Sequence, residues 1–176
     1  MRTAFNKLAA RVAVAAVAGM GVAGVAVPAA RADNAIVELV NFESTKCLQP
    51  ANGSDGAAIV QETCNGSEAQ QWSVTQGENN AEYHNEATGY CIDAFGGAAN
   101  GTRIVQWVCA SPTIGNQRWQ FGQQVGQTSP DGELQSGIVG SDYGYCIATP
   151  GVVNGDAMEL YTSTFSSSEL WYKQAV

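Results

Sequence analysis

The chain contains a single histidine, His84, and it lacks the common motifs of hydrolytic and nucleotide-dependent enzymes. No Gly-x-Ser-x-Gly, His-Glu-x-x-His or P-loop motif occurs, and a lone histidine is more often a structural residue than a general base. Glycosidases need two facing carboxylates, and the sixteen acidic residues present no pair that the sequence singles out. We therefore expect a protein that is not an enzyme and that has no cofactor or metal site.

Basic residues are also few, and half of them lie in an amino-terminal segment of distinct composition. Arg2, Lys7 and Arg11 precede an uncharged Ala/Gly/Val stretch (residues 12–29), which Ala30-Arg31-Ala32 follows. Small residues at these positions are what a signal peptidase reads. We therefore expect residues 1–32 to be a secretion signal peptide and the product to be secreted. The alternative is an uncleaved membrane anchor, since about 20 apolar residues can cross a bilayer.

The remaining residues, 33–176, are strongly acidic. They keep four basic residues (Lys46, Arg103, Arg118 and Lys173) against all sixteen acidic ones, a net charge of −12. Such a surface repels phosphates and anionic lipids and lacks the basic stripe that nucleic-acid binding uses. No later segment resembles a membrane span, so we expect neither nucleic-acid binding nor membrane association after signal cleavage.

The sequence after residue 32 contains one unit three times. Each copy opens with Cys-Leu or Cys-Ile and closes with a tripeptide that ends in tryptophan: Gln70-Gln71-Trp72, Gln117-Arg118-Trp119 and Glu169-Leu170-Trp171. The opening cysteines are residues 47, 91 and 146, so the cysteine-to-tryptophan separations are 25, 28 and 25 residues. The repeats cover about 36–79, 80–130 and 131–176, and together they form one domain, residues 33–176.

Each repeat has the composition of about four short β-strands separated by Gly- and Asn-rich turns, and no segment has a sustained helical period. Three repeats therefore predict an all-β protein of about twelve short strands. A propeller also uses four strands per repeat but typically needs four to eight blades. Three copies instead favour a closed barrel with a hairpin cap and threefold pseudo-symmetry. Trp72, Trp119 and Trp171 are expected in its shared core.

Cysteine spacing within the repeats predicts two disulfide bonds. Cys47 and Cys64 are 17 residues apart, and Cys91 and Cys109 occupy the same places in repeat two, 18 residues apart. Closing loops of this length stabilises a fold by about 3 kcal/mol each in the chain-entropy interpretation. Repeat three has Ser163 at the second position, which leaves Cys146 unpaired. Cys146 is expected to be a buried small hydrophobic residue or an intermolecular cross-link.

These repeated features resemble the ricin B-type lectin β-trefoil, including the carbohydrate-binding trefoil modules of secreted bacterial glycosidases. The resemblance rests on the Cys-Leu/Ile opening, the second cysteine and the Gln-x-Trp motif, and it covers essentially all of residues 33–176. It implies a β-trefoil fold and carbohydrate binding. In this family an Asp two residues after the first cysteine, an aromatic residue two before the second, and an Asn before the Gln-x-Trp motif bind the sugar.

Repeat two has all three of these residues: Asp93, Trp107 and Asn116. A carboxylate accepts hydrogen bonds from neighbouring sugar hydroxyls, an indole ring stacks on the apolar face of a sugar, and an amide both donates and accepts. Gln117 is expected to orient the loop. Val105 departs from the pattern, because many members place a polar residue there. The alternative interpretation is a turn aspartate, a half-buried tryptophan and a loop asparagine.

The other two repeats have lost most of these residues. Repeat one has Gln49, Glu62 and Ala69 at the three positions and is interpreted as scaffold. Repeat three keeps only the ring, as Tyr161, and Glu159 is a weaker candidate for a substitute acceptor. We therefore expect one competent site in three.

The principal hypothesis is a secreted, non-catalytic lectin that binds a neutral sugar or polysaccharide through repeat two. Its partner would be a carbohydrate, either galactose-like or of the xylan or arabinan type, and the oligomeric state is left open. The alternative is a trefoil module that binds a protein, such as a protease, without binding sugar. A small hydrolase is the third hypothesis.

Overall fold

A computed structural model describes residues 35–75, 81–110, 115–122, 132–136 and 144–176. All of them lie in one compact unit, Ala32–Val176. The predicted signal peptide, residues 1–32, lies outside the described residues. Within the described ranges no helix has the length and hydrophobicity needed to cross a membrane.

The described residues form twelve β-strands, four in each repeat, and two single-turn 3-10 helices. Repeat one has β1 (Ala35–Asn41), β2 (Cys47–Pro50), β3 (Ile59–Glu62), η1 (Glu68–Gln70) and β4 (Gln71–Val74). Repeat two has β5 (Tyr83–Asn85), β6 (Cys91–Ala94), β7 (Thr102–Trp107), η2 (Gly115–Gln117) and β8 (Trp119–Gly122). Repeat three has β9 (Glu133–Ser136), β10 (Tyr145–Ala148), β11 (Glu159–Thr162) and β12 (Trp171–Ala175). The expected all-β fold is confirmed.

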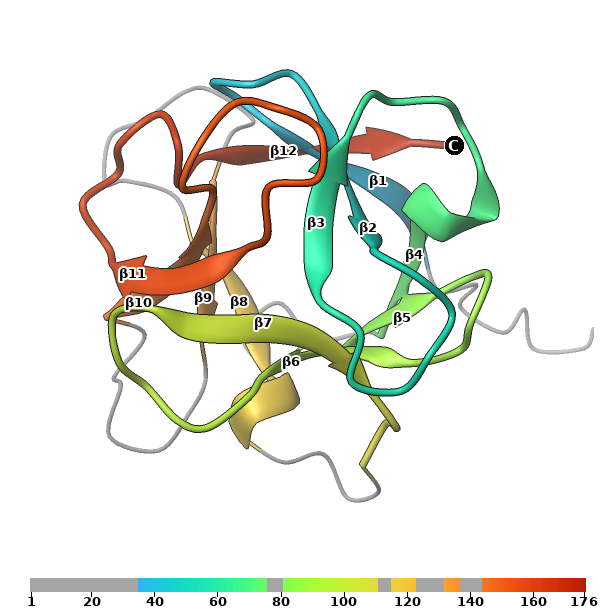
Figure 1. Cartoon of the computed structure of the whole chain (residues 1–176), viewed down its shortest axis with the longest axis horizontal. Helices are drawn as coiled ribbons and strands as arrows, with labels where there is room; N and C mark the ends of the chain where they lie inside the picture. Colours follow the sequence, from blue (N-terminus) through green and yellow to red (C-terminus); the bar gives the residue numbers. More distant parts are fainter. Residues whose placement is uncertain (1–34, 76–80, 111–114, 123–131, 137–143) are drawn as a thin grey trace, which may run out of the picture. The chain divides into compact units, whose positions relative to one another are not determined.

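The first and last strands of the repeats close a six-stranded barrel (Figure 1). β1 pairs with β4, β4 with β5, β8 with β9, and β12 returns to β1, all antiparallel. Single bridges join the other two neighbouring pairs of the barrel. Ala81, just before β5, pairs with Trp119 in β8, and Gly132, just before β9, pairs with Trp171 in β12. A closed barrel leaves no open sheet edge.

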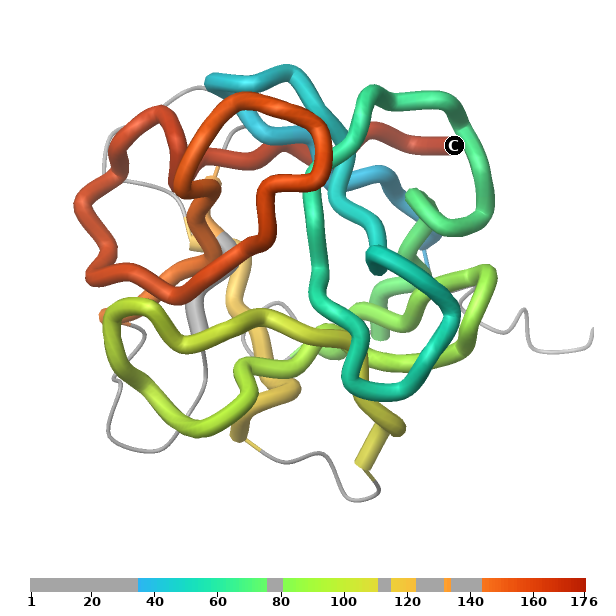
Figure 2. The backbone as a smooth tube through the Cα atoms, viewed as in Figure 1, coloured from blue at the N-terminus to red at the C-terminus, as the bar shows by residue number. Residues whose placement is uncertain are grey.

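The second and third strands of the repeats form three hairpins at one end of the barrel: β2–β3, β6–β7 and β10–β11. β7 pairs with β11. Single bridges join Ala58, just before β3, to Val105 in β7, and Val60 in β3 to Ala157, just before β11. Figure 2 shows the three hairpin loops grouped around this end of the domain. A barrel with this threefold hairpin cap is the β-trefoil, as the repeats predicted.

The three closing tryptophans lie in the shared core, as expected, and all are fully buried. Each indole N–H donates to the carbonyl oxygen one residue after its repeat's first cysteine: Trp72 to Leu48, Trp119 to Ile92 and Trp171 to Ile147, each at 3.0 Å. A buried indole needs such a partner. The common cysteine-to-tryptophan spacing therefore has a structural reason, because it sets one hydrogen bond in every repeat.

Both predicted disulfide bonds, Cys47–Cys64 and Cys91–Cys109, are present. Cys146 is free and buried, which agrees with the expectation of a small hydrophobic residue rather than a cross-link. Burial and the nearby Glu133 and Glu169 raise the pKa of its thiol. Cys146 is therefore a poor nucleophile, since the thiolate is the reactive form.

In repeat three, two buried carboxylates hold the loop in which the second cysteine is missing. Glu133 accepts a hydrogen bond from the hydroxyl of Ser163, which replaces that cysteine. Glu169 accepts from the backbone N–H groups of Thr164 (2.8 Å) and Ser166 (3.1 Å). Polar contacts to buried acids thus take the place of the disulfide bond of the other repeats.

Acidification is expected to loosen this loop. Burial by itself would raise the pKa of Glu169, but the hydrogen bonds from Thr164 and Ser166 outweigh it and hold the pKa below its ordinary value. The folded pKa thus lies below the unfolded one, so Glu169 stabilises the fold above about pH 4.3, and this contribution is lost as the pH falls further. The free energy of unfolding, measured in urea from pH 7 to pH 3, should fall more for the wild type than for Glu169→Gln. Equal slopes would contradict this role.

Candidate functional site

Three of the predicted site residues, from two different elements, meet in repeat two. Asp93 lies in β6, and its side chain is 2% exposed. The Asn116 amide donates to both Asp93 carboxylate oxygens at 2.8 Å, and the Gln117 amide donates to Oδ2 at 2.9 Å. Both donors come from η2. The hairpin strand and the turn before β8 are therefore joined at this carboxylate.

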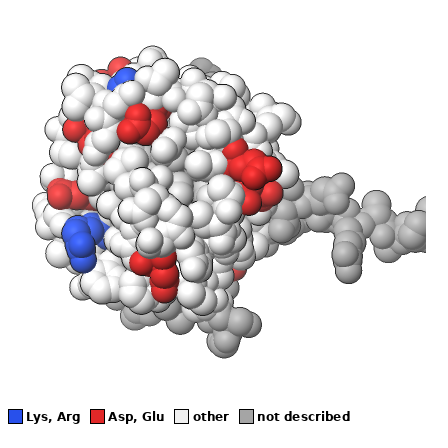
Figure 3. All heavy atoms as spheres, turned by 45° about the vertical axis from the view of Figure 1, so that its right-hand side comes forward, with Lys and Arg blue, Asp and Glu red and all other residues white. Residues whose placement is uncertain are grey.

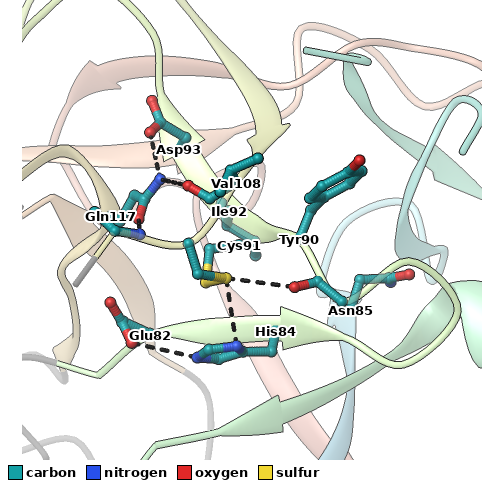
Figure 4. The surroundings of a disulfide bond; sticks show 12 residues. Glu82, His84, Asn85, Tyr90, Cys91, Ile92, Asp93, Val108 and Gln117 are labelled. Atoms are coloured by element: carbon teal, nitrogen blue, oxygen red, sulfur yellow. Dashed lines mark hydrogen bonds and ion pairs between the residues drawn. A yellow bond between two sulfur atoms is a disulfide. The ribbon is translucent and has the colours of Figure 1, made fainter. Parts of the chain in front are cut away.

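Gln117, which is expected from the sequence to orient the loop, makes hydrogen bonds only within the protein. It is fully buried, its Nε2 also donates to the Val108 carbonyl at 3.0 Å, and its Oε1 accepts from the Ala110 N–H at 2.8 Å. Figure 4 shows its amide between Asp93 and Val108. Because every polar atom of this amide bonds to the protein, Gln117 fixes Asp93 and the chain after β7.

The environment of Asp93 opposes its ionisation overall. Burial raises its pKa most, the hydrogen bonds from Gln117 and Asn116 lower it, and the nearby Asp55 carboxylate raises it. Asp55 belongs to the loop between β2 and β3 of repeat one, and its Oδ1 accepts from the Val108 N–H at 3.2 Å. The site in repeat two thus has a second carboxylate at its edge, which comes from the neighbouring repeat.

Trp107 ends β7, and its ring is 38% exposed, whereas the three core tryptophans are fully buried. Phe95 lies beside it, with ring centroids 5.4 Å apart and the planes tilted by 37°. Phe95 is 45% exposed. The two rings therefore form an exposed aromatic surface on the hairpin that carries Asp93.

The β2–β3 loop of repeat one packs against the Trp107 ring. Gly56 has φ +78°, and a Cβ added to it would lie 3.1 Å from Cζ3 of the indole. The buried Gln106 holds this loop, because its Nε2 donates to the carbonyl oxygens of Asn52 (2.9 Å) and Ser54 (2.7 Å). Glycine is needed at position 56 both for the backbone conformation and for the close approach of the ring.

The departure at position 105 has a clear consequence. Val105 is Asp93's partner in the β6–β7 register and is buried. Its side chain supplies no hydrogen-bonding atom, so Asp93 and Asn116 are the polar groups that this part of repeat two can offer to a ligand.

The equivalent places in the other repeats differ in charge and in available groups. In repeat one, Gln70 Nε2 donates to Gln49 Oε1 at 2.8 Å. This contact is equivalent to the one between Gln117 and Asp93 in repeat two, but its acceptor is a neutral amide and not a carboxylate. In repeat three, the Tyr161 hydroxyl donates to Glu159 Oε2 at 2.9 Å. This hydrogen bond raises the pKa of Tyr161. The two weaker candidates thus bond to each other, and the carboxylate position is held by the buried Ala148.

His84 contacts the disulfide bond of repeat two. Its Nδ1 lies 3.4 Å from Cys109 Sγ, and its Nε2 lies 3.3 Å from Glu82 Oε2, as Figure 4 shows. His84, Cys91 and Cys109 cluster closely enough for metal ligands. The two sulfur atoms, however, are bonded to each other, and a disulfide offers no thiolate for coordination. His84 therefore packs against the disulfide as a structural residue.

Residues 35–131, more than half of the chain, match the ricin-type beta-trefoil lectin domain. The chain belongs to this family. The match spans repeats one and two and ends just before β9, where repeat three begins. Repeat three is the copy that lacks the second cysteine and has Glu169 where the other two have the glutamine of the Gln-x-Trp motif. Lectins of this class are carbohydrate-binding proteins, and in this chain the best-preserved repeat is the one with the Asp93 cluster.

Solved structures share the fold at low sequence identity. A designed threefold-symmetric protein, ThreeFoil, has a TM-score of 0.71 and 19% identity over 80% of this chain and 99% of its own. A ricin B-like lectin of Macrolepiota procera, in complex with lactose, has a TM-score of 0.68 and 12% identity over 83% of this chain and 99% of its own.

An exo-beta-1,3-galactanase of Clostridium thermocellum has a TM-score of 0.71 and 22% identity over 82% of this chain. The match occupies 31% of the galactanase chain, so the shared fold makes up only a part of that enzyme. No curated protein matches the chain.

Proposed function

We propose that this lectin-family chain is a secreted, non-catalytic carbohydrate-binding protein with one competent site, in repeat two, for a neutral sugar or polysaccharide. The observation that carries this proposal is the Asp93–Asn116–Gln117 cluster on the hairpin that exposes Trp107. A fixed carboxylate beside an exposed ring offers both the polar and the apolar contacts that a sugar needs. In the described residues, neither of the other repeats combines them.

The polar part of the site is preorganised. Three hydrogen bonds already orient the Asp93 carboxylate, so sugar binding does not require that side chain to be ordered. Because charge-assisted hydrogen bonds are the stronger kind, hydroxyl groups that reach Asp93 should contribute most of the polar affinity. Galactose-like sugars and xylan- or arabinan-type chains are the ligands proposed. The lactose complex of the Macrolepiota procera lectin supports including galactosides.

A neutral-glycan screen tests this function. The purified protein is applied to a glycan array and to immobilised galactan, xylan and arabinan. Retention on at least one neutral glycan is expected, with weak binding to single sugars. Failure to bind any member, together with capture of a secreted protein, would instead support a protein-binding trefoil.

A further inference from the structure

Several side chains of repeat two line one face of the β6–β7 hairpin, and Trp107 lies at one end of this row. Asp93 lies in β6 and Phe95 comes two residues later, directly after that strand, while Arg103, Val105 and Trp107 alternate along β7. Asp93 pairs with Val105, and the Phe95 N–H donates to the Arg103 carbonyl at 3.0 Å. Since alternate residues of a strand share a face, these side chains lie on one surface.

The surface continues across a repeat boundary. β7 pairs with β11, and Arg103 is directly opposite Glu159 in that register, as the neighbouring strands in Figure 1 show. The ring of Tyr161 follows two residues after Glu159 on the same strand. Figure 3 shows a face of the domain on which basic side chains are few among the acidic ones. Arg103 is one of four basic residues against sixteen acidic ones in residues 33–176.

Arg103 is held by stacking rather than by an ion pair. Its guanidinium carbon lies 5.4 Å from the centroid of the Phe95 ring. No ion pair joins Arg103 to any residue of the described ranges, and the Glu159 carboxylate on the neighbouring strand accepts a hydrogen bond from the Tyr161 hydroxyl. A guanidinium has five N–H donors in a planar fork that matches a carboxylate.

We propose that the repeat-two site takes an oligosaccharide in which a carboxylate-bearing sugar, such as a uronic acid, lies next to the neutral sugar on Trp107. This inference rests on the proposed function and extends it. Arg103 pairs with the carboxylate, Phe95 contacts the sugar that carries it, and Asp93 with Asn116 binds the neutral unit.

The other charged groups set the direction of the ligand. Asp55 and Asp93 lie at the Trp107 end, where they repel a second carboxylate. Glu159 lies on the far side of Arg103 and repels a ligand carboxylate from that side. A carboxylate is therefore favoured only at Arg103, so the acidic sugar lies toward Phe95 and the neutral one toward Asp93.

Two matched ligand pairs test the proposal by calorimetric titration: a xylo-oligosaccharide with and without one glucuronic acid branch, and sialyllactose with lactose. In at least one pair, the carboxylated member should bind about fivefold more tightly, since a partly exposed charge pair contributes up to about 1 kcal/mol. Arg103→Gln should abolish the difference between the two members of the pair. Glu159→Gln should increase the difference. Added salt should reduce it.

Lys46→Gln is the matched control, because it removes the same charge from the β1–β2 turn of repeat one. It should leave the preference intact. Equal affinity within both pairs, or a preference that survives Arg103→Gln, would overturn the inference while neutral binding upheld the proposed function. Failure of all four ligands to bind would overturn both.

Discussion

Trp107→Ala is expected to lower glycan affinity by about 30-fold or more. Aromatic anchors at binding sites commonly contribute about 2 kcal/mol or more when truncated to alanine, and each 1.4 kcal/mol is a tenfold change in affinity. Without the indole, the Phe95 ring would be the aromatic surface left on this hairpin. The Asp93 carboxylate would keep its hydrogen bonds but lose the adjacent platform.

The same change should leave the fold nearly intact, because Trp107 is 38% exposed and lies outside the core cluster. Affinity is measured by titration with the best neutral glycan from the screen, and the urea midpoint serves as the folding check. Tyr161→Ala is the matched control, since it removes the ring at the equivalent position of repeat three. Equal losses for the two variants would show that binding is not confined to repeat two.

Trp119→Ala should have the opposite profile, with a large loss of stability. The ring is fully buried, and its N–H donates to the Ile92 carbonyl. Removing a buried tryptophan side chain costs about 3–5 kcal/mol, a large part of the 5–15 kcal/mol by which domains are typically stable. Urea unfolding monitored by circular dichroism measures this loss.

Trp119→Phe separates the two contributions of the indole. Phenylalanine keeps part of the volume but leaves the buried Ile92 carbonyl without its donor, so an intermediate loss is expected. Trp107→Ala is the comparison variant, because it removes the same side chain from a surface position. A Trp119→Ala protein as stable as Trp107→Ala would contradict the structural role of the closing tryptophans.

The repeat pattern was sufficient to predict the main features of the domain. Cysteine spacing predicted both disulfide pairs, because repeats one and two have their cysteines at equivalent positions. The fixed distance from cysteine to tryptophan indicated the core, since one conserved hydrogen bond per repeat depends on it. Asp93 and Asn116 could be grouped in advance because the resemblance to the ricin B-type family places sugar-binding residues at these positions, and Gln117 because it opens the Gln-x-Trp motif.

Contacts between different repeats could not be predicted from the sequence. Nothing in the local pattern of residues 52–56 indicates that Gly56 packs on Trp107 or that Asp55 lies near Asp93, because both depend on how one hairpin packs on the next. Phe95 was missed although a usable signal existed, since it follows Asp93 by two residues and therefore shares its face. The loop contacts of Glu133 and Glu169 were also missed, because the two residues are 36 positions apart.

The central claim is that only repeat two carries a binding site, and the number of sites per chain tests it most directly. Isothermal titration calorimetry of the purified protein with a short form of its best neutral glycan, too short to join two sites, measures that number. The predicted result is one glycan per chain, with no measurable heat for Trp107→Ala. Two or three glycans per chain, or an unchanged titration for Trp107→Ala, would contradict it.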